Sequence, residues 1–452
     1  MSEPDLNLDH FREIIARPGV AECYWIGYSG GLDSHVLLHL CARLRENDFR
    51  FRFHALHIHH GLHAQADTWN IHCLRVCENL HIPLHSLRVQ PQIKSGDSPE
   101  ESARTARYHA FSQALSDNHV LLLAHHRNDQ AETILLQLLR GAGLAGLSGM
   151  PEKAAFARGH ILRPLLDLSR NAILDYARHH SLHWIEDPSN QDRSYDRNYL
   201  RHQVMPIVAA RWPEFGKTLR RSGHHCAEAQ ELLEQIADAD YQTLKHPQHD
   251  TLSIKGLSQL ETKRQRLVLR HWIRRSGYRM PAAVVLERVL RELLPAKADA
   301  NPRVHWSAAE FRRYRNELYL LPPLATIDTT RTDPWDGHQR FQLGPECGFI
   351  EARSSSDVGI SSQAWQSGKI TIGFRQGGEH CHIEGIGEER CLKRLLQKHA
   401  VPPWVRERMP LIYIDGTLAA IADLWVCSDF YTVGEAIKLH WAEHHLGWHQ
   451  AD

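Results

Sequence analysis

Residues 23–44 constrain the fold more than any other stretch of the chain. Residues 24–26 form a short apolar run that is typical of a buried strand, and apolar residues recur at helical spacing over 36–44. Between them, residues 29–34 read Ser-Gly-Gly-Leu-Asp-Ser. A strand, a glycine-rich turn and a helix in this order surround one point with backbone N–H groups and the positive end of a helix dipole. The stretch therefore predicts a phosphate-binding loop in an α/β fold.

The loop also indicates which phosphate chemistry to expect. A Walker A loop has a longer spacing and a lysine before its Ser or Thr, and this turn has neither, so transfer of a γ-phosphoryl group is disfavoured. Asp33 lies inside the loop, where its charge would repel a polyphosphate unless a divalent cation lay between them. We therefore expect a nucleotide together with Mg²⁺. A glycine turn whose Ser and Asp only cap the next helix is the simpler alternative.

Length and composition limit the possible classes of protein. The chain has 452 residues, which predicts two or three domains. With 42% hydrophobic and 23% charged residues, it has no apolar run long enough to span a bilayer. The first residues lack a basic region followed by an apolar one, so we expect a cytoplasmic protein without a signal peptide or a membrane partner. Basic and acidic residues both total 53, so RNA binding would require local basic patches.

Cysteine and histidine do not indicate a metal site. The nine cysteines are scattered without a CxxC pair, which argues against a disulfide framework and against a Cys-rich zinc or iron–sulfur site. Four histidines gather near the end of a predicted strand: His57, His59, His60 and His63. Because no carboxylate or thiol with metal-ligand spacing lies nearby, we interpret them as polar residues at the edge of a sheet.

The first part of the chain alternates between strand and helix patterns. Strands are expected at 51–60, 84–89 and 120–124, and helices at 68–80 and 98–108. Because each crossover is a helix, these elements predict a doubly wound parallel sheet. Ligands of such sheets bind at the carboxyl ends of the strands.

Residues 125–133 directly follow the strand 120–124, so we expect them to face the same crevice as the phosphate-binding loop. Asp129 and Glu132 could bind a metal ion or an amine there. Glu132 comes three residues after Asp129, so this pair also fits a capping box for the helix that runs to Leu139. Both interpretations can hold, with one carboxylate capping the helix and the other binding a ligand.

Two groups of arginines are candidates for binding phosphate. Arg104 and Arg107 lie one helical step apart in the same predicted helix, and a solvated helix face is the alternative. Further along, Arg193, Arg197 and Arg201 repeat at helical spacing and form a basic stripe that suits a phosphate backbone. A mixed charged face is the alternative here too.

The rest of the chain is predicted to form two further domains. Residues 217–335 contain long helical stretches with arginines concentrated at 264–279, and we expect a helical RNA-docking domain, with a plain helix-bundle scaffold as the alternative. Residues 336–452 combine short strands with a basic helix at 391–399, which predicts a small α+β C-terminal domain that binds RNA backbone. The N-terminal α/β domain then covers 1–216.

Several motifs resemble those of known proteins. SGGLDS at 29–34 resembles the SGGxDS signature of the PP-loop pyrophosphatases, which cleave ATP between its α and β phosphates and transfer AMP to a substrate oxygen. ARTARY and AHHRNDQAET, which end at Tyr108 and Thr133, are similar to active-site segments of this group. With RGAGLAGLSGM, EDPSN and the C-terminal FRQGGE, they closely resemble the family of bacterial tRNA(Ile)-lysidine synthetases over nearly the whole chain.

The resemblance implies a reaction. In this family ATP adenylates the C2 oxygen of the wobble cytidine in the CAU anticodon of an isoleucine tRNA. The ε-amine of free L-lysine then displaces AMP and gives lysidine, which changes codon reading from AUG to AUA. ATP and Mg²⁺ are therefore the expected cosubstrate and metal ion. The isoleucine tRNA and L-lysine are the expected partners, with a homodimer as a further possibility.

The resemblance also assigns roles to residues. Nucleotide binding is expected at Ser29, Gly30, Gly31, Leu32, Asp33, Ser34, His60 and Gly61. Catalysis is expected from Asp33, Arg107, His126, Asp129 and Glu132. Asp33 and Asp129 would share Mg²⁺, and Arg107 would stabilise charge on the α-phosphate. The lysine amine would be oriented, or its proton accepted, by Asp129, Glu132 or His126.

Two other functions stay open. A PP-loop tRNA thiolase would combine the same adenylation with a sulfur nucleophile. Cys73 and Cys77 have the wrong spacing for CxxC, which weakens this option but leaves an external sulfur donor open. A non-catalytic tRNA-binding protein that kept the fold is the third candidate, and the intact set of Asp33, Arg107 and Asp129 argues against it.

Overall fold

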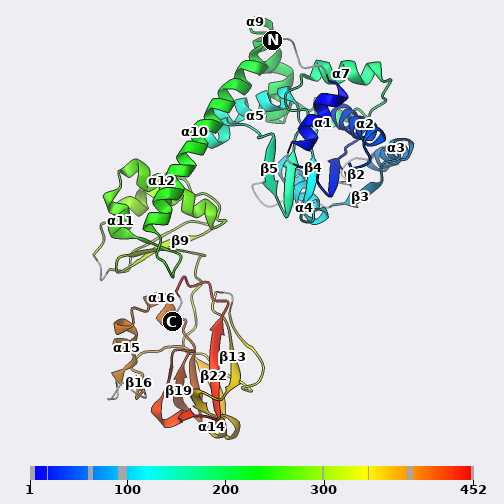
Figure 1. The fold of residues 1–452 in the computed structure, drawn as a ribbon. Coiled ribbons are helices and arrows are strands. Elements are labelled where there is room, and N and C mark those ends of the chain that lie inside the picture. Colours follow the sequence, from blue (N-terminus) through cyan, green and yellow to red (C-terminus); the bar gives the residue numbers. More distant parts are fainter. Residues whose placement is uncertain are drawn as a thin grey trace. The chain divides into compact units, whose positions relative to one another are not determined.

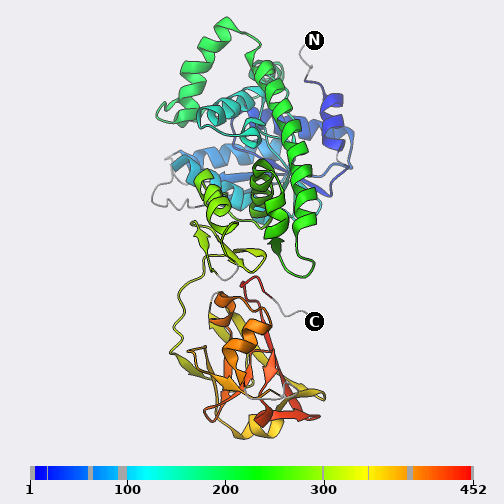
Figure 2. The same ribbon diagram turned by 90° about the vertical axis from the view of Figure 1, so that its left-hand side faces the viewer.

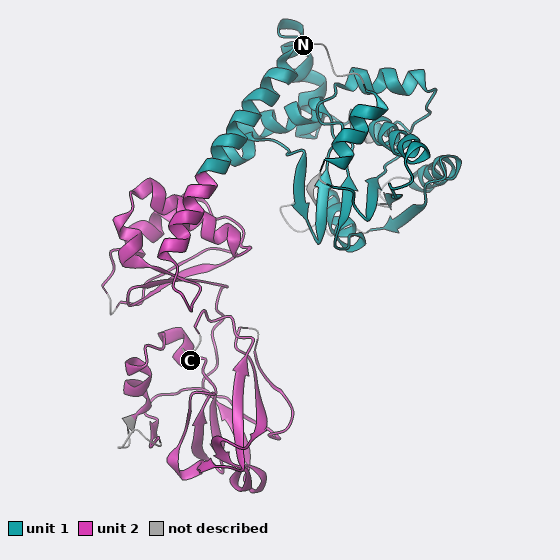
Figure 3. Cartoon of the chain, viewed as in Figure 1, with its two compact units in different colours: residues 1–232 teal, residues 233–452 magenta. Residues whose placement is uncertain are grey.

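The computed structural model describes residues 6–17, 19–59, 65–89, 99–297, 300–344, 346–383 and 390–448. The chain forms two compact units, Met1–Leu232 and Leu233–Asp452 (Figure 3). They divide within helix α10 (Phe215–Leu244), later than the domain boundary predicted after residue 216. The second predicted boundary, after residue 335, lies inside the second unit and stays a prediction.

The first unit is built on a six-stranded sheet with the order β3-β2-β1-β4-β6-β5. Its strands are β1 (Cys23–Gly27), β2 (Phe53–His59), β3 (Leu84–Arg88), β4 (His119–Leu122), β5 (Lys153–Phe156) and β6 (Gly159–Leu162). All run parallel except β5, which pairs antiparallel with β6. The predicted doubly wound parallel sheet is confirmed. The hairpin β5–β6 was not predicted.

Helices cover both faces of this sheet (Figure 1). One face carries α1 (Leu8–Ala16), α2 (Leu32–Asn47), α3 (Ala66–Asn79) and α7 (Arg170–His179), and the other carries α4 (Pro99–Ala114). Successive side chains of a strand point to opposite faces. Accordingly, Tyr24 and Ile26 of β1 pack in the core under α2, whereas Trp25 packs on the α4 side.

The remaining elements of the first unit follow the strand β4 in sequence. They are α5 (Arg127–Leu139), α6 (Leu144–Leu147), η1 (Pro188–Gln191), α8 (Asp196–Tyr199), η2 (Leu200–Val204) and α9 (Met205–Arg211). Side-chain hydrogen bonds hold the end of the glycine-rich loop around α6. The Gln130 side chain donates to the Met150 carbonyl (2.9 Å) and accepts from the Met150 N–H (2.7 Å), which fixes the end of this loop to α5.

Two histidines of α2, the buried His35 and the half-buried His39, make the first unit sensitive to acid. Burial lowers the pKa of His35 and of His39 to about 4. The neighbours of His35 that lower its pKa further are His72, His39 and His183. An unfolded histidine has a pKa of about 6.5, so between pH 6.5 and 4 the unfolded chain binds more protons than the folded chain. The free energy of unfolding is therefore highest above about pH 6.5 and falls as the pH drops from 6.5 to 4.

We expect the free energy of unfolding of the first unit to fall by about 3 kcal/mol between pH 7.5 and pH 4 through His35 alone. Urea unfolding with pulse proteolysis, read on fragments of residues 1–232, measures it. His35→Gln removes this titration, so the variant should lose less stability over the same pH range. An equal loss in both proteins would contradict the assignment.

The first part of the second unit combines helices with a small sheet. Its helices are α11 (Ile254–Gln259), α12 (Thr262–Arg275), α13 (Ala283–Arg288) and η3 (Val289–Leu293). Its strands β7 (Thr251–Ser253), β8 (Arg303–His305), β9 (Glu310–Tyr314) and β10 (Glu317–Leu321) pair in the order β7-β10-β9-β8. Trp272 and Phe311 are fully buried in their shared core, with ring centroids 5.7 Å apart. The predicted helical region is therefore present and also contains a sheet.

Three arginines of α12 are engaged in ion pairs with neighbouring helices. Arg264 pairs with Asp240 of α10, and Arg274 pairs with Glu234 of the same helix. Arg266 binds Glu287 of α13 at 2.6 Å. These arginines pair with acidic residues while their side chains stay about 36–49% exposed, so the RNA-docking role of this domain stays a prediction.

The C-terminal part contains two five-stranded antiparallel sheets among the described residues. One has the order β11 (Thr332–Pro334), β15 (Ile370–Gly373), β18 (Leu411–Ile414), β19 (Thr417–Ile421), β20 (Trp425–Val426). The other has the order β12 (Phe341–Gly344), β13 (Gly348–Ser355), β22 (Ala436–Ala442), β14 (Val358–Ser361), β21 (Tyr431–Val433). The short strands β16 (His380–Cys381) and β17 (Arg390–Cys391) form a separate pair.

Short helices complete this α+β part. They are α14 (Ser362–Ser367), α15 (Leu392–Lys398), α16 (Pro403–Arg406) and η4 (Ser428–Phe430). Leucines of α15 pack into the core that the two sheets share; α15 and α16 are the orange helices of Figure 2. Lys393, Arg394 and Lys398 of α15 are exposed, and none of them has an ion pair among the described residues. The predicted basic helix is thus present and free to meet a polyanion.

None of the described helices combines the length and the apolar character needed to cross a membrane.

Candidate active site

The predicted phosphate-binding loop connects β1 to α2. Gly31 is the N-cap of α2, so backbone N–H groups at the start of the helix are not used within it. Ser34 Oγ accepts from the Ser29 N–H (3.2 Å) and donates to the Gly31 carbonyl (3.0 Å), which closes the turn. Gly30 has a φ of +85°, a conformation that favours glycine. The loop therefore presents the start of a helix at the carboxyl end of β1, as an anion site requires.

Gly30 packs against two side chains that leave no room for a Cβ atom. An added Cβ would lie 2.8 Å from Ile185 Cδ1 and 3.0 Å from Cys73 Sγ. The Gly30 carbonyl also accepts from the Ile185 N–H at 2.9 Å, which ties the loop to the segment that precedes EDPSN. The conformation and the packing both require glycine.

We expect Gly30→Ala to lower the free energy of unfolding of the first unit by about 1–3 kcal/mol. Gly31→Ala is the matched control, because Gly31 has a φ of −77° and an added Cβ would be 3.5 Å from its nearest atom. Urea unfolding of both variants measures the difference. Equal stability of the two variants would contradict the packing argument.

Asp33 and Asp129 approach each other on either side of one histidine. His126 Nε2 lies 3.6 Å from Asp33 Oδ1 and 3.5 Å from Asp129 Oδ2. Asp33 belongs to the first turn of α2, and Asp129 belongs to the first turn of α5. The carboxyl ends of β1 and β4 are adjacent in the sheet, which brings the two turns together. The predicted meeting of the loop with residues 125–133 is confirmed by this geometry.

The environment shifts the two carboxylates in opposite directions. Burial raises the pKa of Asp33, and the nearby charge of Asp129 raises it further. The pKa of Asp129 is lowered to about 2 although its burial opposes this, because His126 and Arg197 stabilise its charge. Asp129 is thus firmly ionised, whereas Asp33 carries a charge that the free protein does not fully compensate.

Glu132 is almost completely buried and is held by two arginines. Arg197 Nε donates to Glu132 Oε2 and Arg201 Nε donates to Glu132 Oε1, each at 2.7 Å. Both guanidinium groups also donate to Asp129 Oδ1 at 3.1 Å. The two carboxylates and the two guanidinium groups therefore form one ion-pair network between α5 and the α8–η2 segment.

This network changes the interpretation of the basic stripe. Arg197 and Arg201 were predicted to face a phosphate backbone together with Arg193. They are instead directed inward, because the buried charges of Asp129 and Glu132 require partners there. The stripe prediction is wrong for these two residues.

The capping box of α5 begins three residues earlier than predicted. His126 is the N-cap, and its Nδ1 accepts from the Asp129 N–H at 3.3 Å. Asp129 Oδ2 in turn accepts from the His126 N–H at 3.0 Å. Asp129 is thus the N3 residue of the capping box, and Glu132 binds Arg197 and Arg201 instead of capping the helix.

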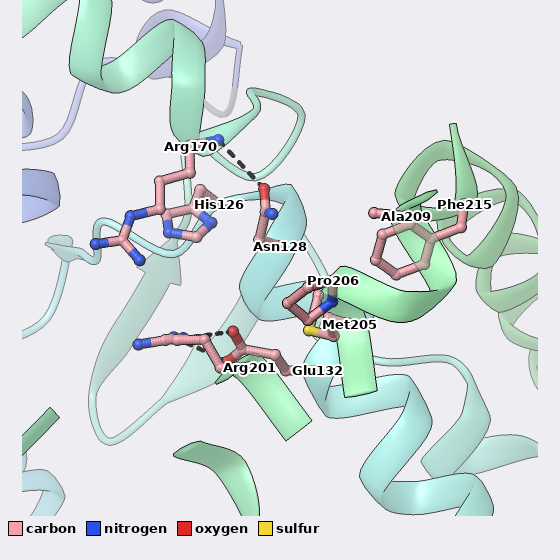
Figure 4. Close-up of a pocket in the computed structure, with 9 residues that line it drawn as sticks. All are labelled: His126, Asn128, Glu132, Arg170, Arg201, Met205, Pro206, Ala209 and Phe215. Atoms are coloured by element: carbon pink, nitrogen blue, oxygen red, sulfur yellow. Dashed lines mark hydrogen bonds and ion pairs between the residues drawn. The ribbon is translucent and has the colours of Figure 1, made fainter. Parts of the chain in front are cut away.

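A cavity of about 220 Å³ adjoins Glu132. Figure 4 shows its lining side chains, which come from α5, α7, η2, α9 and the start of α10: His126, Asn128, Glu132, Arg170, Arg201, Met205, Pro206, Ala209 and Phe215. Asn128 Oδ1 accepts from the Arg170 N–H at 3.2 Å, which fixes the start of α7 beside the cavity. One half of the cavity wall is charged and the other half is apolar.

Not every predicted site residue joins this group. Arg107 lies on α4 with an exposed side chain, and its predicted role stays a prediction. His60 and Gly61 lie outside the described residues. Leu32 is buried beneath the loop, where it anchors the start of α2.

Sequence reasoning missed Arg170 and the active-site role of Arg197 and Arg201. The only sequence signal for Arg197 and Arg201 was their spacing of four residues, which places both side chains on one face of a helix. That spacing indicates a shared face but not what the face meets. Arg170 is the first residue of α7, directly after the N-cap Ser169, and gave no signal of its own.

Comparisons with known proteins bear on the whole chain. The PP-loop domain family matches residues 7–208, the TilS substrate binding domain matches 252–319, and the TilS substrate C-terminal domain matches 370–441. The tRNA(Ile)-lysidine synthase of Methylococcus capsulatus is 41% identical over 96% of this chain and 99% of its own length. The chain belongs to the tRNA(Ile)-lysidine synthase family.

Other members of the family have similar sequence identity to this chain. The tRNA(Ile)-lysidine synthase of Coxiella burnetii is 43% identical over 91% of each chain, and that of Pseudomonas fluorescens is 39% identical over 98% of each chain. Among solved structures, the U34-tRNA thiolase NcsA from Methanococcus maripaludis is 14% identical. It matches 49% of this chain and 78% of its own with a TM-score of 0.42, too low to bear on function. The resemblance to lysidine synthetases drawn from the motifs is confirmed.

Proposed function

We propose that this enzyme uses ATP to attach lysine to C2 of the wobble cytidine of isoleucine tRNA with a CAU anticodon. The observation that carries the proposal is the meeting of Asp33, from the phosphate-binding loop, with Asp129 and Glu132 at one edge of the sheet. This loop suits the pyrophosphate of ATP, and the carboxylates suit an ammonium group. Membership of the tRNA(Ile)-lysidine synthase family along nearly the whole chain supports the assignment.

In the first half-reaction, the cytidine C2 oxygen would attack the α-phosphorus of ATP and pyrophosphate would leave. The N–H groups at the start of α2 would hold the pyrophosphate. Asp33 and Asp129 fit Mg²⁺, because both are carboxylates and Asp33 Oδ1 is buried with no hydrogen-bond partner among the described residues. When bound, Mg²⁺ would neutralise polyphosphate charge. Arg107 remains our candidate for stabilising charge on the α-phosphate.

In the second half-reaction, the neutral form of the lysine ε-amine would attack C2, the C2–O bond to AMP would break, and the amine proton would pass to water or to the departing phosphate. We assign Asp129 and Glu132 to orienting the amine. Asp129 has a pKa of about 2 and is a weak base, and Glu132 uses both carboxylate oxygens to bind Arg197 and Arg201. His126 uses its Nδ1 lone pair for the Asp129 N–H, so its neutral ring carries the proton on Nε2 and lacks a free base.

A sulfur nucleophile from the chain itself is disfavoured. Cys73 and Cys77 are buried, and burial raises the pKa of each thiol to about 12. A thiol of this kind is poorly ionised and inert as a nucleophile.

We further propose that the exposed basic helix α15 contacts the tRNA, that the enzyme works in the cytoplasm, and that it forms a homodimer. Size-exclusion chromatography with light scattering tests the dimer.

The proposed reaction is tested by incubating the full chain with ATP, Mg²⁺, radiolabelled lysine and a transcribed isoleucine tRNA bearing CAU. We expect tRNA-bound label, AMP as coproduct, and lysidine after digestion to nucleosides. Release of AMP that depends on tRNA but proceeds without lysine incorporation would favour another nucleophile. Binding of tRNA without label or AMP would leave only the binding-protein alternative.

A further inference from the structure

A second group of cationic side chains lies across β4 from the phosphate-binding loop, on the β6 side. His125 follows β4, Arg163 follows β6, and Arg104 projects from α4. Arg163 and Arg104 are both near enough to His125 to contribute to its lowered pKa, about 3. The His125 ring is therefore neutral at pH 7 and can donate only one hydrogen bond.

Tyr108 lies near both arginines of this group. The Arg104 guanidinium lies over the Tyr108 ring, 4.9 Å from its centroid. Burial lowers the pKa of Arg163 and the nearby Tyr108 opposes this shift, while Arg163 Nη1 donates to the Pro151 carbonyl at 2.7 Å. The Tyr108 ring packs against Phe111 and Phe156, with centroids 6.0 Å and 5.7 Å away. The two guanidinium groups thus lie near one rigid aromatic side chain.

The group has unused hydrogen-bonding capacity and excess positive charge. Arg163 is 7% exposed, yet its Nε is buried without a hydrogen-bond partner among the described residues, as is His125 Nδ1. Leaving such groups unpaired is costly, so they mark a place for a ligand. Neither Arg104 nor Arg163 has an ion pair among those residues. The nearby Asp129 is already bound by two other arginines.

We propose that Arg104, Arg163 and His125 bind one backbone phosphate of the RNA substrate beside the reacting cytidine. This inference rests on the proposed function. Guanidinium groups pair well with phosphate oxygens, and a neutral imidazole N–H can add one hydrogen bond. The two guanidinium groups lie near Tyr108, and the buried Arg163 Nε and His125 Nδ1 have no hydrogen-bond partner among the described residues, so an anion would complete the group.

The position in the sheet favours RNA over ATP as the source of the phosphate. The loop at the end of β1 is the expected site of the pyrophosphate, and the adenosine is expected on the β2 side, near His60. In the order β3-β2-β1-β4-β6-β5, the Arg104–Arg163 group lies on the opposite side, beyond β4. The second substrate would have to enter from that side.

Binding of a fluorescein-labelled anticodon stem-loop RNA with a CAU loop tests the proposal by fluorescence anisotropy. We expect Arg104→Gln and Arg163→Gln each to weaken the Kd about 5- to 20-fold and to reduce the salt slope by about one. Arg158→Gln is the matched control. Arg158 lies in the turn between β5 and β6, is 70% exposed and pairs with the exposed Asp117. The KM for ATP should stay within about two-fold in all variants.

Single methylphosphonate substitutions in the loop identify the phosphate. At the contacted position, the neutral linkage should weaken wild-type binding by the factor that Arg104→Gln causes, and it should not weaken that variant further. Arg163→Lys keeps the charge and should retain most of the affinity. Because Arg104 is exposed, Arg104→Gln carries the test if Arg163→Gln misfolds.

Additive losses at every methylphosphonate position would overturn the proposal. So would a raised KM for ATP with unchanged RNA binding, which would assign the group to ATP. If the wild-type enzyme forms no lysidine, the proposed function fails, and the anisotropy result still decides whether this group binds RNA phosphate.

Discussion

Replacing Asp33 by Asn should lower the rate of lysidine formation about a thousand-fold or more while leaving the protein folded. Asp33 provides the carboxylate of the phosphate-binding loop, opposite Asp129. An amide of the same shape could neither hold a divalent cation as firmly nor balance its charge. Lysine incorporation into tRNA under saturating ATP measures the effect.

Asp33→Asn should lower activity but should not lower the free energy of unfolding. The pKa of Asp33 is raised, so the folded protein disfavours its charged form, and removal of the charge relieves repulsion from Asp129. We expect the variant to unfold at an equal or higher urea concentration. Asp117→Asn is the control, because Asp117 is 69% exposed and far along the chain from the loop. Lysidine formation by Asp33→Asn at more than a tenth of the normal rate would remove Asp33 from the mechanism.

Replacing Glu132 by Gln should cost both activity and about 3–5 kcal/mol of stability. The side chain of Glu132 is 1% exposed and lies between two guanidinium groups. Without its charge, Arg197 and Arg201, whose side chains are 25% and 24% exposed, share only Asp129, and one positive charge loses its partner. Urea unfolding of the first unit measures the loss.

The exposed pair between Arg17 and Glu152 gives the comparison for Glu132. Its side chains are 61% and 37% exposed, so Glu152→Gln should change stability by less than about 1 kcal/mol. If Glu132→Gln proved as harmless as Glu152→Gln, the ion-pair network would contribute nothing to the fold. If stability fell but lysine incorporation stayed normal, Glu132 would be a structural residue only.

The core of the catalytic domain could be predicted because its pattern is local. The strand–loop–helix of residues 23–44 has its apolar spacing, its glycines and its turn within one continuous stretch. The same holds for β4 and the start of α5. The hairpin β5–β6 escaped prediction, because two strands of four residues are too short to show a period.

Contacts between distant residues could not be predicted from spacing alone. Arg197 and Arg201 were recognised as sharing a helix face, but their partners lie more than 60 residues earlier in the chain. The ion pairs of the α12 arginines could not be predicted either, because their acidic partners belong to other helices. His126 as a helix cap was also unexpected, since Ser, Thr, Asp and Asn are the usual residues at that position.

The two-sided cavity beside Glu132 has a consequence for inhibitor design. Arg170 lines it with positive charge, Arg201 is paired there with Glu132, and Met205 and Phe215 give it an apolar wall. A small carboxylic acid with an aromatic or aliphatic tail matches both halves. Because none of the residues 29–34 lines this cavity, we expect such a compound to inhibit without competing with ATP, and therefore to keep its potency at cellular nucleotide concentrations.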